Sequence, residues 1–455
     1  MIKNKIYKSD WLASDPIFYN EKSLEISHNI NDVIDYANIN FHPEGLANYL
    51  SWGYSVFGQT PIENVKFLLP NQILIKSKSK HLIIKNIEDP IEDWSHKPSK
   101  AKNVIELIES KVDNWGSNLK NPLVLPLSGG YDSRLLGSMI KNKLNSYSYT
   151  FGPTRKQNDS FEVKYAEATA IKLGLNWEHI KLGNYHKYLD DWNDLYGVST
   201  HAHGMYQLDF YNQIKRKHKN ASILSGIIGD AWSGKVIINR IQSIADLSHL
   251  GYSHGVHADS ESSLLGNPMD LKIAYLSDQK EKFRVPGGQV IASMRMKMIL
   301  LSYLFKVPES LGFSFYGPFL ESDIACAMLN LPQVERENRL WQTRYFCEQD
   351  LLWEKNYKYP VKRVNTINQD LINEHPLRPL NVKILSQIIN PNYVSWINNN
   401  LMQNIVSKIA TFSLNTRYLG YFANQLHVPN VQLNAYFAYL TLKPLEVLLL
   451  KREGI

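Results

Sequence analysis

The stretch LVLPLSGGYDSRLLGSMI, which runs from Leu123 to Ile140, carries the strongest structural signal in this chain of 455 residues. Its apolar start, from Leu123 to Leu125, is typical of a buried strand. Two adjacent glycines interrupt the apolar run, and apolar residues resume at helical spacing from Leu135 onward. The stretch therefore predicts a strand, a tight turn and a helix in direct succession.

The turn has the chemistry of a phosphate site. Ser128, Gly129 and Gly130 can direct backbone N–H groups into one concavity at a helix N-terminus, where unpaired donors and the positive end of the helix dipole favour an anion. Asp132 would repel a bare anion there. It fits a magnesium ion bound between carboxylate and phosphate, because Mg²⁺ in proteins is usually held by one or two carboxylates plus phosphate oxygens.

The segment SGGYDS, from Ser128 to Ser133, resembles the SGGxDS signature of the pyrophosphate-loop ATPases, which cleave ATP between the α and β phosphates. Every fixed position of that signature is filled. The resemblance implies that ATP and Mg²⁺ bind here, with Ser128, Gly129, Gly130, Asp132 and Ser133 as the binding residues. The alternative interpretation is that the two glycines only form a turn.

A second glycine-rich stretch, GDAWSGKV from Gly229 to Val236, nearly matches the Walker loop G-x-x-x-x-G-K-[ST]. Val236 stands where that loop needs a hydroxyl to bind magnesium. We therefore prefer the loop that starts at Ser128 as the nucleotide site.

Composition limits the class of protein. With 44% apolar and 20% charged residues the chain is an ordinary globular protein, long enough for two domains. The net charge of +7 is modest and no long basic run appears, so nucleic-acid binding is not indicated. No apolar run reaches the roughly 18 residues of a membrane span and the N-terminus lacks a signal-peptide core, which predicts a cytoplasmic protein. Cys326 and Cys347 lack metal-ligand spacing and are predicted to be reduced core residues.

Residues 1–95 show short strand-like runs and a helical pattern from Pro43 to Leu50. The text WLASDPIFYN and the segment around YLSWG and LLPNQ resemble the second half of the glutamine-hydrolysing domain of asparagine synthetases, with Asn71 in place of a glycine. The resemblance implies a small α+β remnant of an N-terminal-nucleophile (Ntn) domain. Position 2 is Ile2 where that family has its catalytic cysteine. We therefore expect no glutaminase, and nitrogen must arrive as free ammonia or as an amine.

Residues 96–455 form the second predicted domain. After an amphipathic helix, strand-like runs (123–125, 146–151, 177–182, 221–224) alternate with helical patterns (161–173, 186–196, 205–217). This alternation predicts an α/β fold, a doubly wound parallel sheet covered by helices. In such sheets ligands bind beyond the carboxyl ends of the strands, where Ser128 is expected to lie.

The next predicted strand ends in ILSGIIGDAWSG, from Ile223 to Gly234, which resembles the second asparagine-synthetase signature, commonly SGEGSDE. Ser225, Gly226 and Asp230 occupy the matching positions. The match implies that Ser225 and Gly226 bind nucleotide and that Asp230 is the second magnesium ligand, opposite Asp132. Two carboxylates on two strand ends can hold the metal that neutralises the departing charge. The alternative role for Asp230 is a helix N-cap.

Four positions depart from the family pattern. Ile227 stands where asparagine synthetases have a catalytic Glu and β-lactam synthetases a Tyr, and Ala231 replaces a further Glu. In SFYGPFLESD, Tyr316 and Glu321 stand where arginine and aspartate are usual. These changes indicate a reshaped acceptor site, and loss of activity is the competing interpretation.

Further candidates come from the same resemblance. His201 and His203, in STHAHGMY, could replace the lost acid–base residue because imidazole titrates near neutral pH, although a lone histidine is more often structural. Phe151 ends the run whose backbone contacts adenine in the family. Lys362 or Arg363, in LWEKNYKYPVKRVNT, is the nearest equivalent of a lysine that stabilises the reacting α-phosphate, or belongs to a solvated basic turn.

Taken together, the residues and the resemblance predict an ATP-dependent amide ligase that does not use glutamine. A carboxylate is adenylated with release of pyrophosphate, and ammonia or an amine then attacks. The expected substrate is a small-molecule, sugar or peptide carboxylate, with a uronic acid or amino acid of a surface-sugar or natural-product pathway as the leading guess. The alternatives are an intramolecular cyclase that forms a lactam or isopeptide bond, and a non-catalytic nucleotide-binding subunit. A partner protein or homo-oligomer is also possible.

Overall fold

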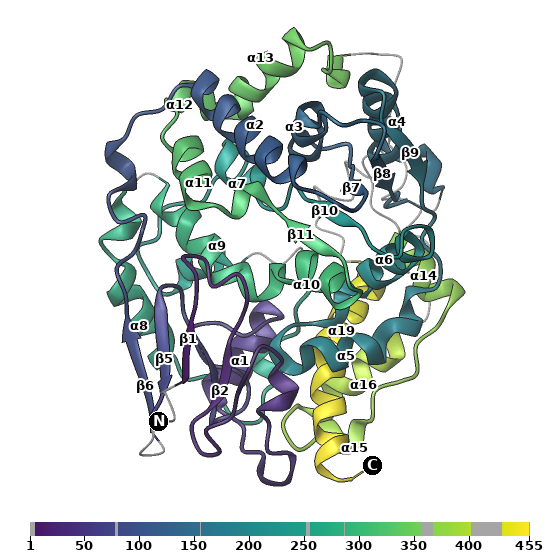
Figure 1. Ribbon diagram of the computed structural model, residues 1–455. Coiled ribbons are helices and arrows are strands. Elements are labelled where there is room, and N and C mark those ends of the chain that lie inside the picture. The colour runs from purple at the N-terminus through teal and green to yellow at the C-terminus, as the bar shows by residue number, and fades with distance from the viewer. Residues whose placement is uncertain are drawn as a thin grey trace.

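A computed structural model of the chain describes residues 5–77, 81–154, 156–251, 255–285, 287–355, 367–401 and 430–454. Its centre is a parallel sheet of five strands (Figure 1). The strands are β7 (Leu123–Pro126), β8 (Ser146–Thr150), β9 (Asn176–His179), β10 (Ser222–Leu224) and β11 (Ser314–Tyr316). This mixed α/β arrangement with a parallel sheet agrees with the predicted fold class.

The strand order is β11-β10-β7-β8-β9, and every neighbouring pair is parallel. From β7 the chain adds β8 and β9 on one side, and then returns to add β10 and β11 on the other. The carboxyl ends of β7 and β10 therefore flank the point where the winding direction reverses. Sheets of this kind bind ligands in the crevice at that point.

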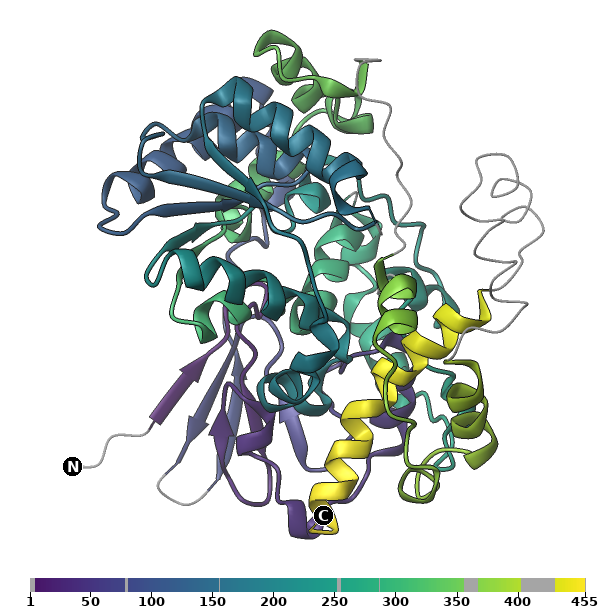
Figure 2. The ribbon, with the colours of Figure 1, turned by 90° about the vertical axis from the view of Figure 1, so that its right-hand side faces the viewer.

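Helices cover both faces of the sheet (Figure 2). In that view the blue helices α2 (Ala101–Ser117), α3 (Tyr131–Met139) and α4 (Phe161–Leu173) lie above the strands. The helices α5 (Leu189–Tyr196) and α6 (Tyr206–Lys217) follow β9, and α6 leads back to β10. The predicted segments thus form the expected elements, with boundaries that differ by a few residues.

Local chemistry explains where α4 begins and ends. The side chain of Ser160 accepts a hydrogen bond from the backbone N–H of Val163, which satisfies one of the unpaired donors at the helix start. Gly174 follows the last turn with φ = 66°, a left-handed conformation that glycine adopts without strain. The strands β7 and β10 are apolar and almost wholly buried, as expected for strands covered on both faces.

The N-terminal residues form two small antiparallel sheets in the lower part of Figure 1. One contains β1 (Lys5–Lys8), β5 (Gln72–Lys76) and β6 (Leu82–Asn86); the other contains β2 (Phe18–Asn20), β3 (Ile26–Ser27) and β4 (Val65–Phe67). Helix α1 (Pro43–Trp52) packs beside them. Asn71 has φ = 57°, a left-handed conformation that glycine, and less often asparagine, adopts.

These N-terminal elements share a hydrophobic core with the rest of the chain, since Leu46, Tyr49 and Leu50 of α1 belong to the same buried cluster as Val124 and Tyr149 of the parallel sheet. Tyr49 also donates a hydrogen bond to the carbonyl of Thr441 at 3.0 Å. Whether residues 1–95 are an Ntn remnant, and whether a domain boundary lies near residue 95, remain predictions.

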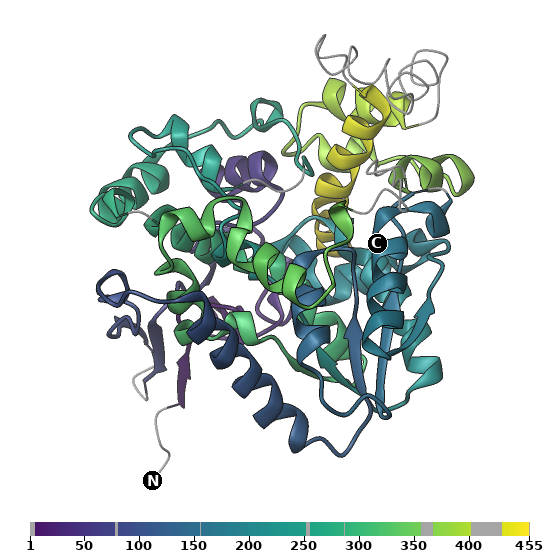
Figure 3. The same ribbon diagram turned by 90° about the horizontal axis from the view of Figure 1, so that it is seen from above.

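The remaining described helices lie around these sheets, with α12 and α13 at the top of Figure 1 and α15 and α16 at its lower right. They are α7 (Gly229–Ser233), α8 (Asp270–Gln279), α9 (Gly288–Leu301), α10 (Tyr303–Ser310), α11 (Ser322–Leu329), α12 (Gln333–Arg336), α13 (Leu340–Glu348), α14 (Ile367–Glu374), α15 (Val382–Leu385), α16 (Pro391–Asn400) and α19 (Val431–Arg452). Seen from above, the dark blue helix α2 runs next to the green helices, of which α11 contacts it (Figure 3).

Two details differ from the sequence predictions. The apolar stretch from Met294 to Phe305 predicts a single helix, but it forms parts of two helices, α9 and α10, which are separated at Ser302. Cys347 is exposed on α13, so its predicted place in the core was wrong, while Cys326 is half-buried on α11. Both cysteines are free. Within the described ranges, no helix combines the length and the apolar character that crossing a bilayer requires.

Candidate functional site

The loops after β7 and β10 pack directly against each other at the reversal point of the sheet. A Cβ atom added at Gly226 would lie 2.9 Å from the backbone nitrogen of Ser133, and one added at Gly229 would lie 2.8 Å from Cγ of Asp132. Both contacts are closer than real Cβ atoms come, so both positions need glycine. The structure therefore brings together the two motifs that the sequence singled out, around Ser128 and around Asp230.

Two carboxylates face each other where these loops meet. Desolvation, followed by the negative charge of Asp230, raises the pKa of Asp132 to about 7. The positive charges of Arg339 and Lys235 and a hydrogen bond from Gln342 Nε2 to Asp132 Oδ1, at 3.4 Å, act in the opposite direction. Lys235 Nζ lies 3.7 Å from Asp230 Oδ2. The two acids are thus close enough to repel, and two cations lie near them.

This donor set fits a magnesium ion. A divalent cation between Asp132 and Asp230 would remove the repulsion that disfavours their joint ionisation. Two carboxylates leave the remaining positions of an octahedral ion for phosphate oxygens and water, which is the usual arrangement in nucleotide-dependent enzymes. Among the described residues, no group of three or more His, Cys, Asp or Glu side chains is placed to hold a metal.

The N–H groups of the glycine loop have protein partners. Ser128 N–H donates to Ser133 Oγ at 3.0 Å, and Gly130 N–H donates to Ser128 Oγ at 3.1 Å. Gly129 N–H donates to a carboxylate oxygen of Glu162, in the first turn of α4, at 2.7 Å. Glu162 thus supplies negative charge at the donor where the sequence predicts phosphate. Its sequence signal is an acid at the start of the helix that follows β8.

Sequence reasoning missed Arg134, which is fully buried in α3. Its NH2 group donates to the carbonyl of Gly129 at 2.8 Å, and its NH1 group donates to the carbonyl of Leu351 at 3.0 Å. The same two nitrogens bind the two carboxylate oxygens of Glu354 at 3.0 and 3.1 Å. The rings of Tyr131, Tyr165 and Phe346 surround the guanidinium. Arg134 therefore ties the glycine loop to residues 351–354; its only sequence signal is a charge within an otherwise apolar helical pattern.

The loop before Asp230 is strained. Ile228 has φ = 56°, a left-handed conformation that is an outlier for a β-branched residue. Such a residue costs about 1–3 kcal/mol and persists only where the surrounding structure imposes it, which is common at functional sites. Ile227 stands where the acid–base residue was expected, and it is buried. Its side chain packs on Gly317, where an added Cβ would lie 3.0 Å from Cγ2 of Ile227. Ala231, in place of the second Glu, is also buried.

His201 and His203 lie before α6, which crosses from β9 to β10, so they belong to the same edge of the sheet as the two loops. His201 is buried, and its Nδ1 accepts the backbone N–H of His203 at 3.3 Å. His203 is half-buried, with its Nε2 3.2 Å from the side-chain nitrogen of Asn368. A role for either histidine as a base remains a prediction.

Phe151 follows β8 and starts a row of aromatic contacts along this edge. Its ring centroid lies 5.6 Å from that of Tyr206, which in turn lies 5.6 Å from that of His203. The ring of Tyr206 therefore connects Phe151, at the predicted adenine position, with His203, a predicted base. The adenine contact itself remains a prediction.

Tyr316 and Glu321, at the positions of the family arginine and aspartate, are hydrogen-bonded to each other. Lys111 of α2 pairs with Glu321 and, at 2.9 Å, with Asp323. Trp115 stacks on the ring of Tyr316 with a centroid distance of 5.1 Å. Both substituted side chains therefore anchor the end of β11 to α2.

A further lysine was missed in the sequence. Lys297 lies on α9, which contacts α7, and it is half-buried. Burial lowers its pKa to about 8, while the negative charge of Asp230 acts to raise it. The signal was a basic residue inside the apolar run MRMKMILL. Lys362 and Arg363, the predicted α-phosphate contacts, lie outside the described residues.

No protein-family model matches the chain, and no curated protein does. The NH3-dependent NAD synthetase of Campylobacter jejuni, solved with a nitrate ion, matches at 15% identity and a TM-score of 0.26, over 45% of this chain and 96% of that one. The glutamine-dependent NAD+ synthetase of Acinetobacter baumannii, solved with ADP, matches at 12% identity and a TM-score of 0.23, over 56% of this chain and about half, 52%, of that one. Both similarities are too weak to support a conclusion about function.

Proposed function

We propose that this chain is an ATP-dependent amide ligase, which adenylates a substrate carboxylate and then joins it to ammonia or an amine. One observation carries the proposal. Asp132 and Asp230 approach each other at the reversal point of a parallel sheet, beside the SGGYDS loop, through close contacts at Gly226 and Gly229. This is the place where such a sheet binds a nucleotide, and the acids fit its metal.

In the proposed first step, the loop from Ser128 to Ser133 holds the β and γ phosphates, which replace the carboxylate of Glu162 at the N–H of Gly129. Asp132 and Asp230 would hold magnesium, which supplies charge neutralisation when bound. A carboxylate oxygen of the substrate attacks the α-phosphorus, the bond from the α-phosphorus to the bridging oxygen breaks, and pyrophosphate leaves. Lys235 and Lys297, both near Asp230, add positive charge on the side of the departing group. Such preorganised charge is usually the largest contribution to catalysis.

In the second step an amine nitrogen attacks the acyl carbon, AMP leaves with the electron pair of the broken C–O bond, and one proton must be removed from the nitrogen. We propose His203 for that proton. His201 is buried and its Nδ1 already accepts a backbone N–H, whereas His203 is half-buried and lies against Tyr206 at the edge of the site. A positioned base is typically worth about 10²- to 10⁴-fold in rate.

The first experiment incubates the protein with ATP labelled at the α phosphate, Mg²⁺, ammonia and a panel of carboxylates, and separates the products. Formation of labelled AMP with pyrophosphate supports the proposal, and labelled ADP would contradict it. Asp132→Asn should abolish AMP formation. The matched control is Asp191→Asn, because Asp191 is an exposed acid of α5.

A non-catalytic nucleotide-binding subunit is the second candidate. The burial of Ile227 against Gly317 favours it, because an apolar side chain fills the position of the family acid–base residue. Binding of ATP without AMP formation, under every carboxylate and amine tested, would support this candidate. The cytoplasmic location, the absence of nucleic-acid partners and the existence of a partner protein remain expectations from the sequence.

A further inference from the structure

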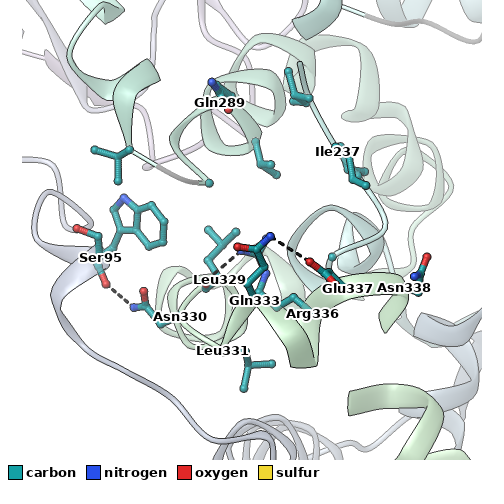
Figure 4. Close-up of a pocket in the computed structure, with 17 residues that line it drawn as sticks. Ser95, Ile237, Gln289, Leu329, Asn330, Leu331, Gln333, Arg336, Glu337 and Asn338 are labelled. Carbon is teal, nitrogen blue, oxygen red and sulfur yellow. Dashed lines mark hydrogen bonds between the residues drawn. The ribbon is translucent and has the colours of Figure 1, made fainter. Parts of the chain in front are cut away.

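A cavity of about 810 Å³ lies between the chain after α7, the start of α9 and the segment from Leu329 to Asn338 (Figure 4). Its wall has an apolar part, with Trp94, Val236, Ile238, Val290, Leu329 and Leu331 among the lining residues, and a polar part of smaller area. The polar residues are mostly neutral amides, such as Gln289 and Asn330, and the charged lining residues are Arg336 and Glu337. The volume is in the range of pockets that enclose a small molecule.

Two wall segments of the cavity continue directly into the candidate site. Gly234 and Val236 line the cavity, while Lys235 between them pairs with Asp230 at 3.7 Å. Asn338 lines it too, and the next residue, Arg339, lies over the Tyr131 ring at 4.0 Å and acts on the pKa of Asp132. The cavity and the carboxylate pair are therefore neighbours that share these two segments.

Arg336 is the cation of this lining. Its backbone packs on Gly234, where an added Cβ would lie 2.1 Å from the carbonyl oxygen of Arg336. The NH1 group donates to the carbonyl of Leu329 at 3.2 Å, while the buried Nε–H has no hydrogen-bond partner among the described residues. In Figure 4 the side chain lies in the middle of the lining residues, close to Gln333 and Leu329. Because the Nε atom is closed to solvent, an acidic group in the cavity would bind the terminal NH1 and NH2 groups, which can donate several N–H groups to one carboxylate.

We propose that this cavity binds a carboxylic acid with a mainly apolar body, and that Arg336 holds its carboxylate. Resting on the proposed function, this acid is the substrate that becomes adenylated. The apolar wall from Val236, Ile238, Val290 and Leu329 disfavours a sugar acid, because hydroxyl groups placed against that wall would lose hydrogen bonds to water, and only hydroxyls that reach the amide side chains could replace them. We therefore expect the cavity to bind an aliphatic acid, an aryl acid or an apolar amino acid in preference to a uronic acid.

The experiment measures binding by calorimetry, without nucleotide, so that its outcome is independent of catalysis. The probes are 4-phenylbutyrate, its neutral analogue 4-phenyl-1-butanol, and glucuronate. We expect 4-phenylbutyrate to bind best and Arg336→Gln to weaken it about tenfold or more, the usual effect of losing a charged hydrogen bond, while the alcohol changes little. Val236→Trp should fill the cavity and weaken both apolar probes. The matched control is Arg344→Gln, which removes an arginine paired with Glu335 outside the cavity.

Each outcome decides a part of the proposal. Absence of binding at millimolar concentration, equal binding by glucuronate, or an unchanged affinity in a folded Arg336→Gln variant would overturn it. If Arg336→Gln does not fold, Arg336→Lys and Val236→Trp give the same test. Binding that persists in Asp132→Asn, combined with failure of every bound acid to yield AMP, would reject the proposed function while the binding site stands.

Discussion

Arg134 and Glu354 form a two-point ion pair, with nitrogen-to-oxygen distances of 3.0 and 3.1 Å, although 220 residues separate them in sequence. The guanidinium is fully buried, while a quarter of the Glu354 side chain is exposed. Because Arg134 also binds the carbonyl of Gly129, the pair connects the glycine loop to the segment that precedes residues 356–366 in sequence. We infer that this pair holds the loop in its shape.

Glu354→Gln should therefore lower both stability and the rate of pyrophosphate release. Breaking a buried pair typically costs 3–5 kcal/mol, and we expect about 3 kcal/mol here because Glu354 is partly exposed. Arg134→Lys should be nearly as damaging, since an ammonium group cannot reproduce the two-point contact. Urea unfolding measures the first effect. The control is Lys172→Gln, which breaks an exposed pair with Asp350 and should cost at most about 1 kcal/mol.

A second prediction concerns Gly229. In Gly229→Ala the new Cβ would lie 2.8 Å from Cγ of Asp132 and 2.9 Å from the Phe319 ring, so the two loops must separate. Overpacking of this kind costs about 1–3 kcal/mol, and pyrophosphate release should fall because Asp132 moves. Gly116→Ala is the matched control: nothing lies within 4 Å of its added Cβ, and in helix α2 it should stabilise by about 0.4–1 kcal/mol. Equal effects of the two substitutions on activity would contradict the contact.

The third prediction is a pH dependence of stability. His186 Nδ1 donates to the carbonyl of His375 at 2.8 Å, and Nε2 lies 2.9 Å from the Tyr436 hydroxyl, from which it accepts when the ring is neutral. Desolvation lowers its pKa from 6.5 to about 4, with the charge of His375 acting in the same direction and the hydrogen bond to its carbonyl opposing it. The unfolded chain binds a proton between these values and the folded chain does not. The contribution of neutral His186 to the free energy of unfolding is therefore fully present above pH 6.5. It decreases by about 3 kcal/mol as the pH falls toward 4.

Urea unfolding between pH 7.5 and pH 4.5 tests this dependence in the wild type and in His186→Gln. The difference in unfolding free energy between the two proteins should shrink as the pH falls, because the variant has no group to protonate at that position. A difference that stays constant across this pH range would show that His186 does not titrate as described.

The sequence predicted those parts of the site that depend on neighbouring residues. The strand, the turn at Gly129 and Gly130, and the helix that carries Asp132 follow from local pattern, as does the strand β10, whereas Asp230 was singled out only by the resemblance of its loop to a known signature. The alternation of strands and helices also predicted a parallel sheet, and therefore that both loops share its edge. Contacts across the sequence could not be predicted: nothing near Arg134 names Glu354 as its partner.

Conformation and burial were also hidden in the sequence. The left-handed conformation of Ile228 contradicts the preference of a β-branched residue, because the packing of the two loops overrides it. Lys297 and Arg336 looked like isolated charges, and only the tertiary structure places one near Asp230 and the other in a cavity. The helix break at Ser302 gave no signal, since Ser302 lies within an apolar run without glycine or proline.

The final prediction separates the two histidines. His203→Ala should slow amide formation while adenylation, followed as exchange of labelled pyrophosphate into ATP, stays nearly unchanged, because only the second step needs the base. His201→Ala should instead lower stability by about 1–3 kcal/mol, since His201 is buried and its ring packs against Gly53, where an added Cβ would lie 2.6 Å from Cδ2. If His203→Ala slows adenylation and amide formation equally, His203 is not the base, and the proton must leave by another route.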